Sequence, residues 1–310
     1  MTCMSDLILR LSVGEVLDSY RTCEFATLTR SGAPVAWPTT GIVAEDGTFL
    51  LTTSIGLPQK AFNVRRDPRV ALLFSDPLGS GLANPEQILV RGEASCPDEI
   101  RAAPSGDLAR LWARLMERQP SSQAYLDWPA TKFTDFYFMR LVITVTPTEI
   151  VNRPLPEFDH SAPRPHLLGA DVLAGYPSVV LTAVDESGAP VLHRTTVTAE
   201  DGGFRVVVPA NLPVAAGPAG LLVHTHDEKL AKLHSASVRG TLTADERGWL
   251  LVPERLVEPG GRRGAGALET VRTLRGFRAA TRRYLDKRGW DRPEIPWRDY
   301  RAIRATVRKS

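Results

Sequence analysis

The sequence predicts a mainly β protein with helices, in which one small antiparallel β module occurs twice and a helical tail follows. The pentapeptide Ser-Gly-Ala-Pro-Val at 31–35 returns unchanged at 187–191. Four further landmarks recur in the same order, so we expect each copy to fold as one unit. These landmarks are 39–40 with 195–196, 44–47 with 199–202, 57–58 with 212–213, and 90–92 with 238–240.

The spacing of these landmarks shows where the two copies differ. The second copy follows the first by 156 residues at Ser31 and by 155 at Leu57, but by only 148 at Val90. The second copy has therefore lost about seven residues between its Leu-Pro and Val-Arg-Gly landmarks. In the first copy, the same stretch holds the strongest candidate for a ligand site.

Short β-rich runs separated by turns make up the first copy. The turn at 30–32 joins two such runs, and a Glu-Asp-Gly turn at 45–47 precedes another. Ser12 with Glu15 three residues on forms a capping box and predicts a short helix to about Tyr20. The sequence predicts strands at 24–29, 33–39, 42–44, 48–53, 70–75, 87–94 and 136–145, and helices at 61–66 and 108–116.

A stretch rich in Pro and His from Asn152 to Leu168 is the candidate linker between the copies. Beyond Gly260, apolar residues recur every three positions from Leu268 and predict an amphipathic helix. The stretch after Gly289 is expected to be an irregular, packed strap. We divide the chain into a first β domain at 1–153, a linker at 154–175, a degenerate second copy at 176–260 and a basic helical extension at 261–310.

Composition predicts a globular protein of the cytoplasm. Of the 310 residues, 43% are hydrophobic, which suffices for a sizeable core, and no run of apolar residues is long enough to predict a membrane span. The N-terminus does not have the pattern of a secretion signal. Three cysteines, an odd number confined to the first copy, predict reduced thiols rather than a disulfide framework or a structural zinc site.

Positive charge is concentrated in the tail. Residues 261–310 hold fifteen Lys or Arg and five Asp or Glu, whereas the remaining chain holds 23 basic and 30 acidic residues. One interpretation is an arginine-rich helix that is solvated or docks on the acidic body. The other is a collar for an anionic ligand. Because no nucleic-acid motif or row of stacking aromatics accompanies the charge, we expect no nucleic-acid partner.

Polar residues that suit a phosphate cluster where one predicted strand of the first copy ends. The run 52–54 offers three hydroxyls, a loop follows at 55–58, and Lys60 opens the next helix. Asn63 and Arg66 lie about one turn further on. Hydroxyls, a cation and helix N-terminal amides together stabilise an anion. The same residues would also fit a polar strand end followed by a capped surface helix.

Several motifs of the first copy carry a family resemblance. The most specific is the block Lys60-x-x-Asn63-x-Arg65-Arg66-Asp-Pro-Arg-Val at 60–70. The others are Phe-Ala-Thr-Leu at 25–28, Ser-Gly-Ala-Pro at 31–34, Gly-Thr-Phe at 47–49, Thr-Ser at 53–54, and Val-Arg-Gly-Glu-Ala at 90–94. The sequence resembles the pyridoxamine 5′-phosphate oxidase-like, FMN-binding split-barrel superfamily, including its flavin/deazaflavin oxidoreductase branch. The resemblance is good over about 13–151 and degenerate over about 176–259, and the tail lies outside it.

The resemblance implies a six-stranded split barrel that pairs face to face with a second barrel and holds a flavin between them. This chain would then be two tandem split β-barrels that form an internal pseudo-dimer. By analogy the flavin phosphate would contact Thr52, Thr53, Ser54 and Lys60, the ring would lie against Trp37, Pro38 and Thr39, and Asn63 and Arg66 would complete the cofactor-binding set.

The second copy departs from the pattern. Ala215 stands where the offset of 155 places the counterpart of Lys60, and 216–220 is too short to supply the Asn-x-Arg-Arg helix. We therefore expect one competent site in each chain. The C-terminal substrate signature of true pyridoxamine phosphate oxidases is also missing, so oxidation of vitamin B6 is not expected.

All six histidines follow Val151. His224 and His226 are two residues apart and would share one face of a strand. They could be a hydrogen-bonded strand face, a ligand pair for a metal or haem, or a contact to the bound ligand from the second barrel. No third ligand is placed by spacing, so no metal site is predicted. The others are His160, His166, His193 and His234.

These features together predict a flavin-dependent oxidoreductase acting on a small-molecule substrate, with NAD(P)H as a candidate electron donor. FMN is the first choice of cofactor, a deazaflavin coenzyme the second and haem the third. A flavin- or haem-binding storage or sensor protein is the non-enzymatic alternative. No side chain stands out as a general acid or base, so no catalytic residue is predicted.

Overall fold

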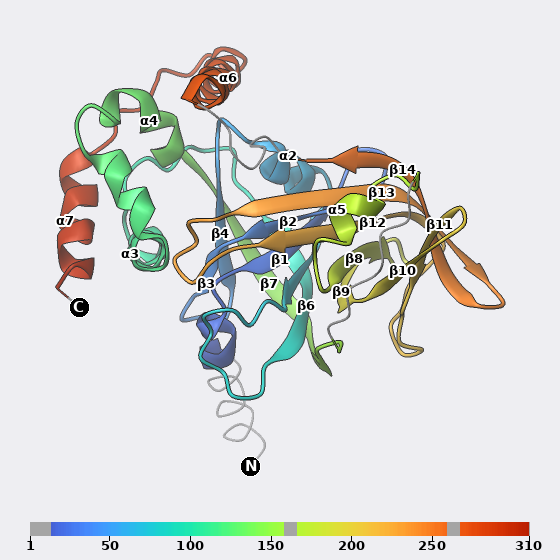
Figure 1. The fold of residues 1–310 in the computed structure, drawn as a ribbon. Coiled ribbons are helices and arrows are strands. Elements are labelled where there is room, and N and C mark those ends of the chain that lie inside the picture. The colour runs from blue at the N-terminus through green and yellow to red at the C-terminus, as the bar shows by residue number, and fades with distance from the viewer. Residues whose placement is uncertain (1–13, 158–165, 259–266, 310) are drawn as a thin grey trace.

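The chain forms two curled antiparallel sheets, one from each copy of the repeat, with most helices gathered beside the first (Figure 1). This computed structural model describes residues 14–157, 166–258 and 267–309. The predicted fold class, two tandem split β-barrels with a helical tail, is confirmed. Residues 14–19 are helical as predicted, while the capping residue Ser12 lies outside the described residues.

The first sheet has seven strands in the order β2-β1-β5-β6-β7-β4-β3. All neighbouring pairs are antiparallel, as expected for a meander with short connections. The strands are β1 (Cys23–Leu28), β2 (Pro34–Thr39), β3 (Gly41–Val43), β4 (Phe49–Ser54), β5 (Arg69–Phe74), β6 (Glu86–Ser95) and β7 (Arg140–Pro154).

The second sheet repeats the first strand for strand. Its order is β9-β8-β12-β13-β14-β11-β10, which is the first order with each strand replaced by its counterpart in the repeat. Each sheet has one strand more than the six that the resemblance implies. The additional strand is the short edge strand β3 in the first sheet and β10 in the second. The strands are β8 (Val179–Val184), β9 (Pro190–Thr195), β10 (Val197–Glu200), β11 (Gly203–Val206), β12 (Gly217–Thr225), β13 (His234–Asp245) and β14 (Gly248–Val257).

A matching β-bulge explains why Val-Arg-Gly recurs in both copies. The register of β6 shifts between Arg91 and Gly92, and that of β13 shifts between Arg239 and Gly240. A Cβ atom on Gly92 would lie 2.3 Å from the backbone oxygen of Thr146, and one on Gly240 would be closer still to its own neighbour. Glycine is therefore required at this bend in each barrel.

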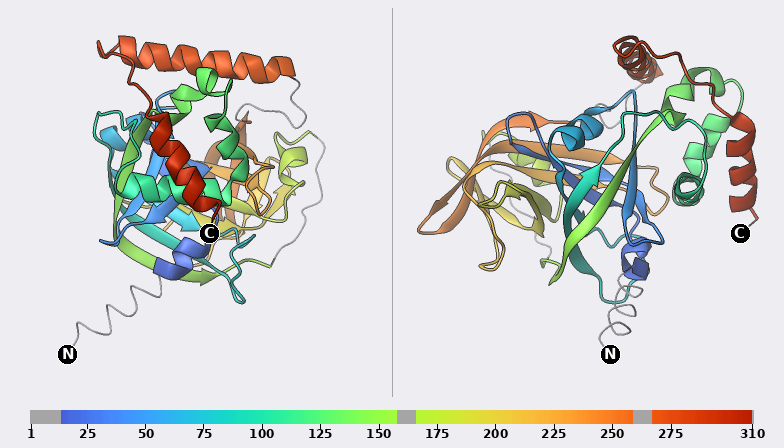
Figure 2. Two further views of the ribbon diagram at one scale, coloured as in Figure 1. Left: turned by 90° about the vertical axis from the view of Figure 1, so that its left-hand side faces the viewer. Right: turned by 180° about the vertical axis from the view of Figure 1, so that it is seen from behind.

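The two barrels pack against each other along a surface that we call the seam. Strands β1, β2, β5 and β6 of the first barrel contact β8, β9 and β12 of the second, and Figure 2 shows the two sheets side by side. Small and aliphatic side chains fill this contact, which lets the two sheets approach closely. They are Ala26, Ala36, Ala71, Leu73, Leu89, Val180, Leu192 and Leu222.

Helices from three parts of the chain complete the first barrel. Its core includes Trp112 from the insertion and Tyr300 from the tail, and both rings pack on Phe138. The second barrel has a separate and smaller core. The helices are α2 (Gln59–Arg66), α3 (Asp107–Arg118), the 3₁₀ helix η1 (Pro120–Leu126), α4 (Thr131–Phe138), α5 (Ala170–Leu173), α6 (Ala267–Asp286) and α7 (Trp297–Val307).

Two predictions of local structure were wrong. The run from Phe136 was predicted as a strand, but α4 continues to Phe138 and β7 begins at Arg140. Aromatic residues favour strands in general, yet here Phe138 packs on Trp112 of α3 and Trp297 of α7, while Phe136 packs on Phe277 of α6. The stretch after Gly289 is irregular only as far as Pro296, after which α7 follows.

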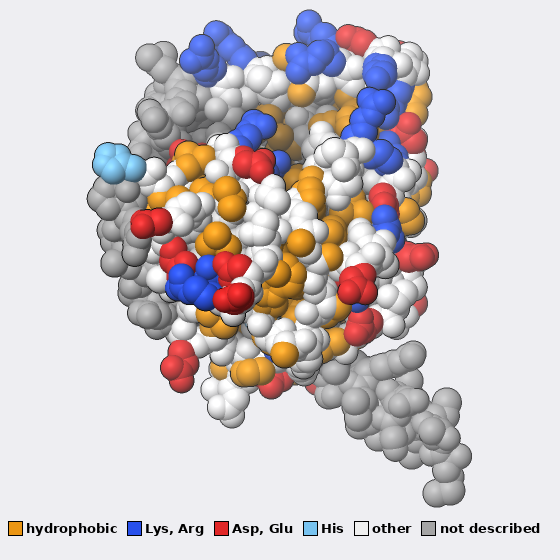
Figure 3. Space-filling model, turned by 90° about the vertical axis from the view of Figure 1, so that its right-hand side faces the viewer, with side chains coloured by type: hydrophobic (Ala, Val, Ile, Leu, Met, Phe, Trp, Pro, Cys, Tyr) orange, Lys and Arg blue, Asp and Glu red, His pale blue; other side chains and the backbone are white. Residues whose placement is uncertain are grey.

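The basic helix α6 lies across the loop that joins β4 to α2 (Figure 2). A Cβ atom on Gly56 of that loop would be 3.3 Å from both the backbone oxygen of Phe277 and the hydroxyl of Thr281. Phe62 of α2 also stacks on Tyr284 of α6. The outer side of α6 carries exposed arginines, and Figure 3 shows basic side chains gathered along that edge of the molecule. They are Arg272, Arg275, Arg278, Arg282 and Arg283.

None of the helices in the described ranges is long and apolar enough to span a bilayer.

Candidate functional site at the seam

A cavity of about 430 Å³ opens at the seam, and both barrels and α3 contribute to its wall. This size is typical of a pocket for a small organic ligand. We call it the seam cavity. Its lining residues are Thr22, Pro38, Thr39, Thr40, Thr52, Tyr137 and Arg140 from the first barrel and α4; Leu115 and Gln119 from α3 and its end; and His224, Thr225, His226, Leu230, Leu233, His234 and Ser235 from the second barrel.

Three of the predicted cofactor residues line the seam cavity directly. Pro38 and Thr39 end strand β2, and Thr52 lies on β4. Each of the three is partly exposed, unlike the buried residues that begin the same strands. These two strands thus bring a hydroxyl-bearing wall to the cavity, and the predicted contact of these residues with a cofactor stays a prediction.

Lys60 and Trp37 are not among the residues that line the seam cavity, and the Nζ of Lys60 lies 5.8 Å from the ring centroid of Trp37. Lys60 is close enough to the lining residue Arg140 for the two positive charges to repel. Burial lowers the pKa of Lys60 to about 8, and repulsion from Arg140 adds to the effect. Among the described residues, no carboxylate forms an ion pair with it. The ammonium group is therefore held close to the cavity without a counter-ion.

Thr53 and Ser54 use their hydroxyl hydrogens within the chain. Thr53 donates to the backbone oxygen of Leu57 at 2.7 Å, and Ser54 donates to that of Phe136 at 2.6 Å. Ser54 also accepts a hydrogen bond from the amide of Gly56. A hydroxyl has one hydrogen to donate, so neither residue can donate to an anion in this arrangement. Both hold the loop under α6 in place.

Asn63 and Arg66 also have local partners. Asn63 is fully buried, and its side chain donates to the hydroxyl of Thr27 at 2.9 Å. Its carbonyl accepts hydrogen bonds from Gln59 and Arg66. Asn63 therefore fixes α2 against β1, while Arg66 is exposed on the outer side of α2.

Arg140 is a cavity residue that the sequence reasoning did not select. It is the first residue of β7, paired with Ser54 of β4. Its guanidinium lies 4.2 Å from the ring centroid of Tyr137 and 4.9 Å from that of Trp112. The signal in the sequence is a single cation within the apolar run at 136–145. Predicting that run as one continuous strand obscured this signal.

The second barrel contributes histidines to the opposite wall of the cavity. His224 and His226 both lie at the end of β12, and their rings are roughly parallel with centroids 6.3 Å apart. The Nε2 atom of His226 lies 3.3 Å from the hydroxyl of Thr22 and 3.4 Å from a carboxylate oxygen of Asp76. Its Nδ1 donates to the backbone oxygen of Asp227. Both histidines line the seam cavity, and their predicted contact with a bound ligand stays a prediction.

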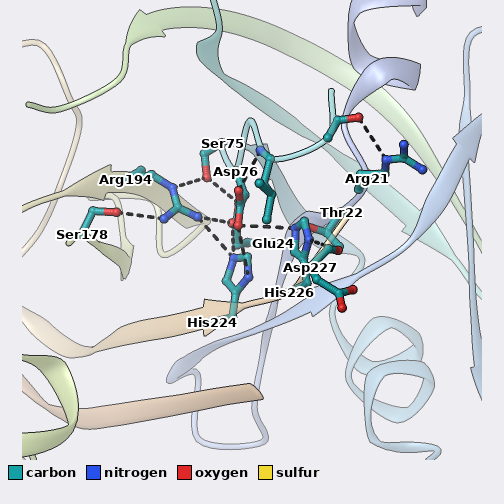
Figure 4. A network of polar contacts seen from close by, with 12 residues as sticks. Arg21, Thr22, Glu24, Ser75, Asp76, Ser178, Arg194, His224, His226 and Asp227 are labelled. Carbon is teal, nitrogen blue, oxygen red and sulfur yellow. Dashed lines mark hydrogen bonds and ion pairs between the residues drawn. The ribbon is translucent and has the colours of Figure 1, made fainter. Parts of the chain in front are cut away.

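His224 joins a buried polar network that ties the barrels together (Figure 4). Its Nε2 donates to Glu24 of β1 at 2.6 Å, and Arg194 of β9 donates to the same carboxylate at 2.8 Å. Arg194 also reaches Ser75, which donates to Glu24. Burial alone would raise the pKa of Glu24, but Arg194 and the hydrogen bonds from His224 and Ser75 hold it below its ordinary value.

The counterpart of the seam cavity in the second barrel lacks the polar residues. At the offset of 155, Val207, Val208 and Pro209 stand where the first copy has its three hydroxyls. Ala215 replaces Lys60, and no helix intervenes between β11 and β12. At the offset of 156, Arg194 replaces Pro38, and its side chain lies in the Glu24 network instead of lining a cavity.

Within the described residues, no group of three or more His, Cys, Asp or Glu side chains is placed to hold a metal ion. The thiols of Cys23 and Cys96 are buried and unpaired by disulfides. Burial raises the pKa of both, which keeps them protonated and unreactive at neutral pH.

No family model matches this chain, and no curated protein does. Solved structures do match, each over less than half of this chain. A proposed pyridoxamine 5′-phosphate oxidase from Listeria innocua is 19% identical, covering 46% of this chain and 97% of that one with a TM-score of 0.31. The haem storage protein HutZ from Vibrio cholerae is 14% identical, covering 46% and 92% with a TM-score of 0.32. An F420 reductase is 21% identical, covering 44% and 93% with a TM-score of 0.27.

The two half-barrel sheets fit the tandem split barrel that the sequence resemblance implied. The matched proteins differ in the ligand that their descriptions name. The ligand of this chain must therefore be argued from its own residues.

Proposed function

We propose that the chain is a flavin-dependent oxidoreductase that holds FMN in the seam cavity and acts on a small-molecule substrate. One observation carries the proposal: a cavity of about 430 Å³ lies between the hydroxyls of the first barrel and the histidines of the second. Lys60, close to the lining residue Arg140, has no counter-ion among the described residues. An anionic, partly aromatic ligand would satisfy all of these groups.

The residues of the first barrel would bind and orient the cofactor. Trp37, Pro38 and Thr39 would flank the ring system, and Lys60 with Thr52 would bind the phosphate. Thr53, Ser54 and Asn63 would act indirectly, because their hydrogen bonds fix the loop and helix that carry Lys60. When bound, the flavin would supply the hydride and electron transfer.

The second barrel would close the cavity. Leu230 and Leu233 would exclude water from one side, and His226 would hold a proton near the ligand through its contacts with Thr22 and Asp76. A redox reaction of a flavin is accompanied by proton movement, so a titratable group at this wall has a use in the proposed reaction.

A deazaflavin coenzyme is the second candidate, and the position of α6 favours it. The exposed arginines of α6 lie beside the loop that follows Ser54, where an acidic extension of the coenzyme could reach them. Haem comes third, because His226 uses both ring nitrogens in contacts with the chain and His224 directs Nε2 at Glu24.

The proposal is tested with purified full-length protein. Riboflavin, FMN and a deazaflavin coenzyme are titrated separately, with binding followed by fluorescence and visible absorption. We expect FMN to bind more tightly than riboflavin, at one equivalent per chain. NADH or NADPH is then added to the loaded protein under anaerobic conditions.

Loss of the oxidised flavin band on addition of NADH or NADPH would support an oxidoreductase. Binding without reduction by any donor would support the storage or sensor alternative. Failure of all three ligands to bind would refute the proposal.

A further inference from the structure

Arg140 stands out among the buried arginines because its side chain has no hydrogen-bonding partner among the described residues. Three arginines of the described residues are at least nine-tenths buried: Arg118, Arg140 and Arg194. Arg118 donates to two backbone oxygens, and Arg194 binds Glu24, Ser75 and Ser178. The side chain of Arg140 forms no hydrogen bond or ion pair with any described residue, and its Nε is buried without a partner.

A buried guanidinium without an acceptor is costly. Moving a charged donor out of water costs on the order of several kcal/mol of solvation free energy unless an acceptor in the protein or a ligand replaces the water. The rings of Tyr137 and Trp112 provide cation–π contacts at 4.2 and 4.9 Å, and these offset only part of the cost. They also hold the planar group in one orientation at the wall of the seam cavity.

The surroundings of Arg140 are suited to an anion. Lys60 is close enough for the positive charge of Arg140 to help lower its pKa to about 8. Thr39 and Thr52 add hydroxyl groups to the same cavity. Two cations without a carboxylate partner among the described residues, next to hydroxyl donors, form a site of positive potential. Arginine presents a planar fork of donors that matches the oxygens of a phosphate or carboxylate.

We propose that the seam cavity binds an oxyanion group, a phosphate or a carboxylate, at Arg140. The group would belong either to the phosphate of the cofactor or to an anionic substrate bound next to it. The assignment of the cavity as a ligand site is shared with the proposed function, but the oxyanion site does not depend on the ligand being a flavin.

The first experiment uses the ligand-free full chain and inorganic pyrophosphate. Thermal unfolding is measured with and without pyrophosphate for the wild type, for Arg140→Met, and for Arg101→Met as the matched control. Arg101 is hydrogen-bonded to Arg140 through the backbone, but its side chain is exposed and paired with Glu99. We expect pyrophosphate to raise the melting temperature of the wild type and of Arg101→Met but not of Arg140→Met.

The second experiment separates the two sources of the oxyanion. FMN and riboflavin are titrated into the wild type, Arg140→Met and Arg140→Lys. If Arg140 binds the cofactor phosphate, Arg140→Met should weaken FMN binding at least tenfold and leave riboflavin unchanged. If Arg140 instead binds a substrate anion, FMN affinity should persist in Arg140→Met. Succinate or inorganic phosphate should then perturb the flavin spectrum of the loaded wild type and not that of the variant.

The outcomes separate this proposal from the proposed function. Stabilisation by pyrophosphate that depends on Arg140, with no binding of any flavin, would keep the oxyanion site and refute the flavin. If Arg140→Met melts at a lower temperature yet responds to pyrophosphate, FMN, succinate and phosphate as the wild type does, the residue has only a packing role and the oxyanion site is refuted. Arg140→Lys keeps the charge, so its partial binding would show that Arg140→Met had not merely misfolded.

Discussion

The first barrel ends strand β4 with Thr52, Thr53 and Ser54, whereas the second barrel follows the matching strand β11 with two valines and a proline. Both barrels nevertheless keep the same strand order and the same glycine at the bulge of the fourth strand in that order. Residues that the backbone geometry requires have been retained in both copies, while residues suited to a ligand occur in only one. Similarity of fold between the two halves therefore implies nothing about two equivalent sites.

The largest expected effect is at the polar network of the seam. Arg194→Met would leave Glu24 buried without its cation, which costs about 3–5 kcal/mol of unfolding free energy. Denaturant unfolding measures the loss. Arg205→Met serves as the control, because Arg205 forms a more exposed pair with Asp245 and should cost less than about 1 kcal/mol. Equal losses in the two variants would show that the network does not hold the barrels together.

The next largest effect is expected on FMN affinity when Lys60 of the first barrel is replaced. Lys60→Ala should weaken FMN binding by about 1.5–3 kcal/mol, the usual contribution of a charged hydrogen bond, and should leave riboflavin binding unchanged. Flavin fluorescence titration measures both affinities. Lys132→Ala is a matched control, since Lys132 also lies over an indole ring, 5.7 Å from Trp128, but away from the cavity. Unchanged FMN affinity in Lys60→Ala would remove Lys60 from the site.

The lowered pKa of Lys60 predicts that FMN affinity depends on pH, with a smaller effect than the substitution of Lys60. Between about pH 7, where the FMN phosphate has lost its second proton, and about pH 8, the ammonium is charged in the free protein, so FMN affinity should be nearly constant. As the pH rises through about 8, the free protein loses this proton, and binding the phosphate requires taking it up again. FMN affinity should then fall by up to tenfold per pH unit, and Lys60→Met should abolish the fall. A pH profile identical in that variant would contradict this assignment.

The smallest expected effect concerns the second barrel. Ala215→Lys restores the cation of the first copy but not the helix α2 that positions it, so we expect no second site. The stoichiometry from a flavin titration should remain one per chain. Two equivalent sites in the wild type or in this variant would show that the second barrel binds a ligand without the residues of the first.

Much of the fold could be predicted because the internal repeat indicated that both halves fold alike and the family resemblance implied a split barrel for each. Periodicity also located α2 and α3 within a few residues. The run from Phe136 was misassigned because aromatic residues favour strands, whereas here contacts of Phe138 with α3 and α7, far apart in sequence, accompany a helix. The turn from α4 into β7 between Phe138 and Arg140 carries no glycine or proline to mark it.

The site was less predictable than the fold. The sequence supplied Pro38, Thr39 and Thr52 as residues near a ligand, and the structure places them around one cavity. It could not show that Thr53 and Ser54 donate their hydroxyl hydrogens to nearby carbonyls, because those bonds depend on the path of the backbone. Arg140 and the Glu24 network depend on contacts between residues far apart in the chain, which spacing alone does not reveal.

The placement of the tail has a consequence for how the protein is made. Tyr284 and Tyr300 belong to the core of the N-terminal barrel, and the whole second barrel lies between them and the rest of that core in sequence. During translation, the surface of the first barrel around Trp112 therefore stays uncovered until α7 has been made. The core of the second barrel contains no residue of the tail, so that core is complete before α7 is synthesised.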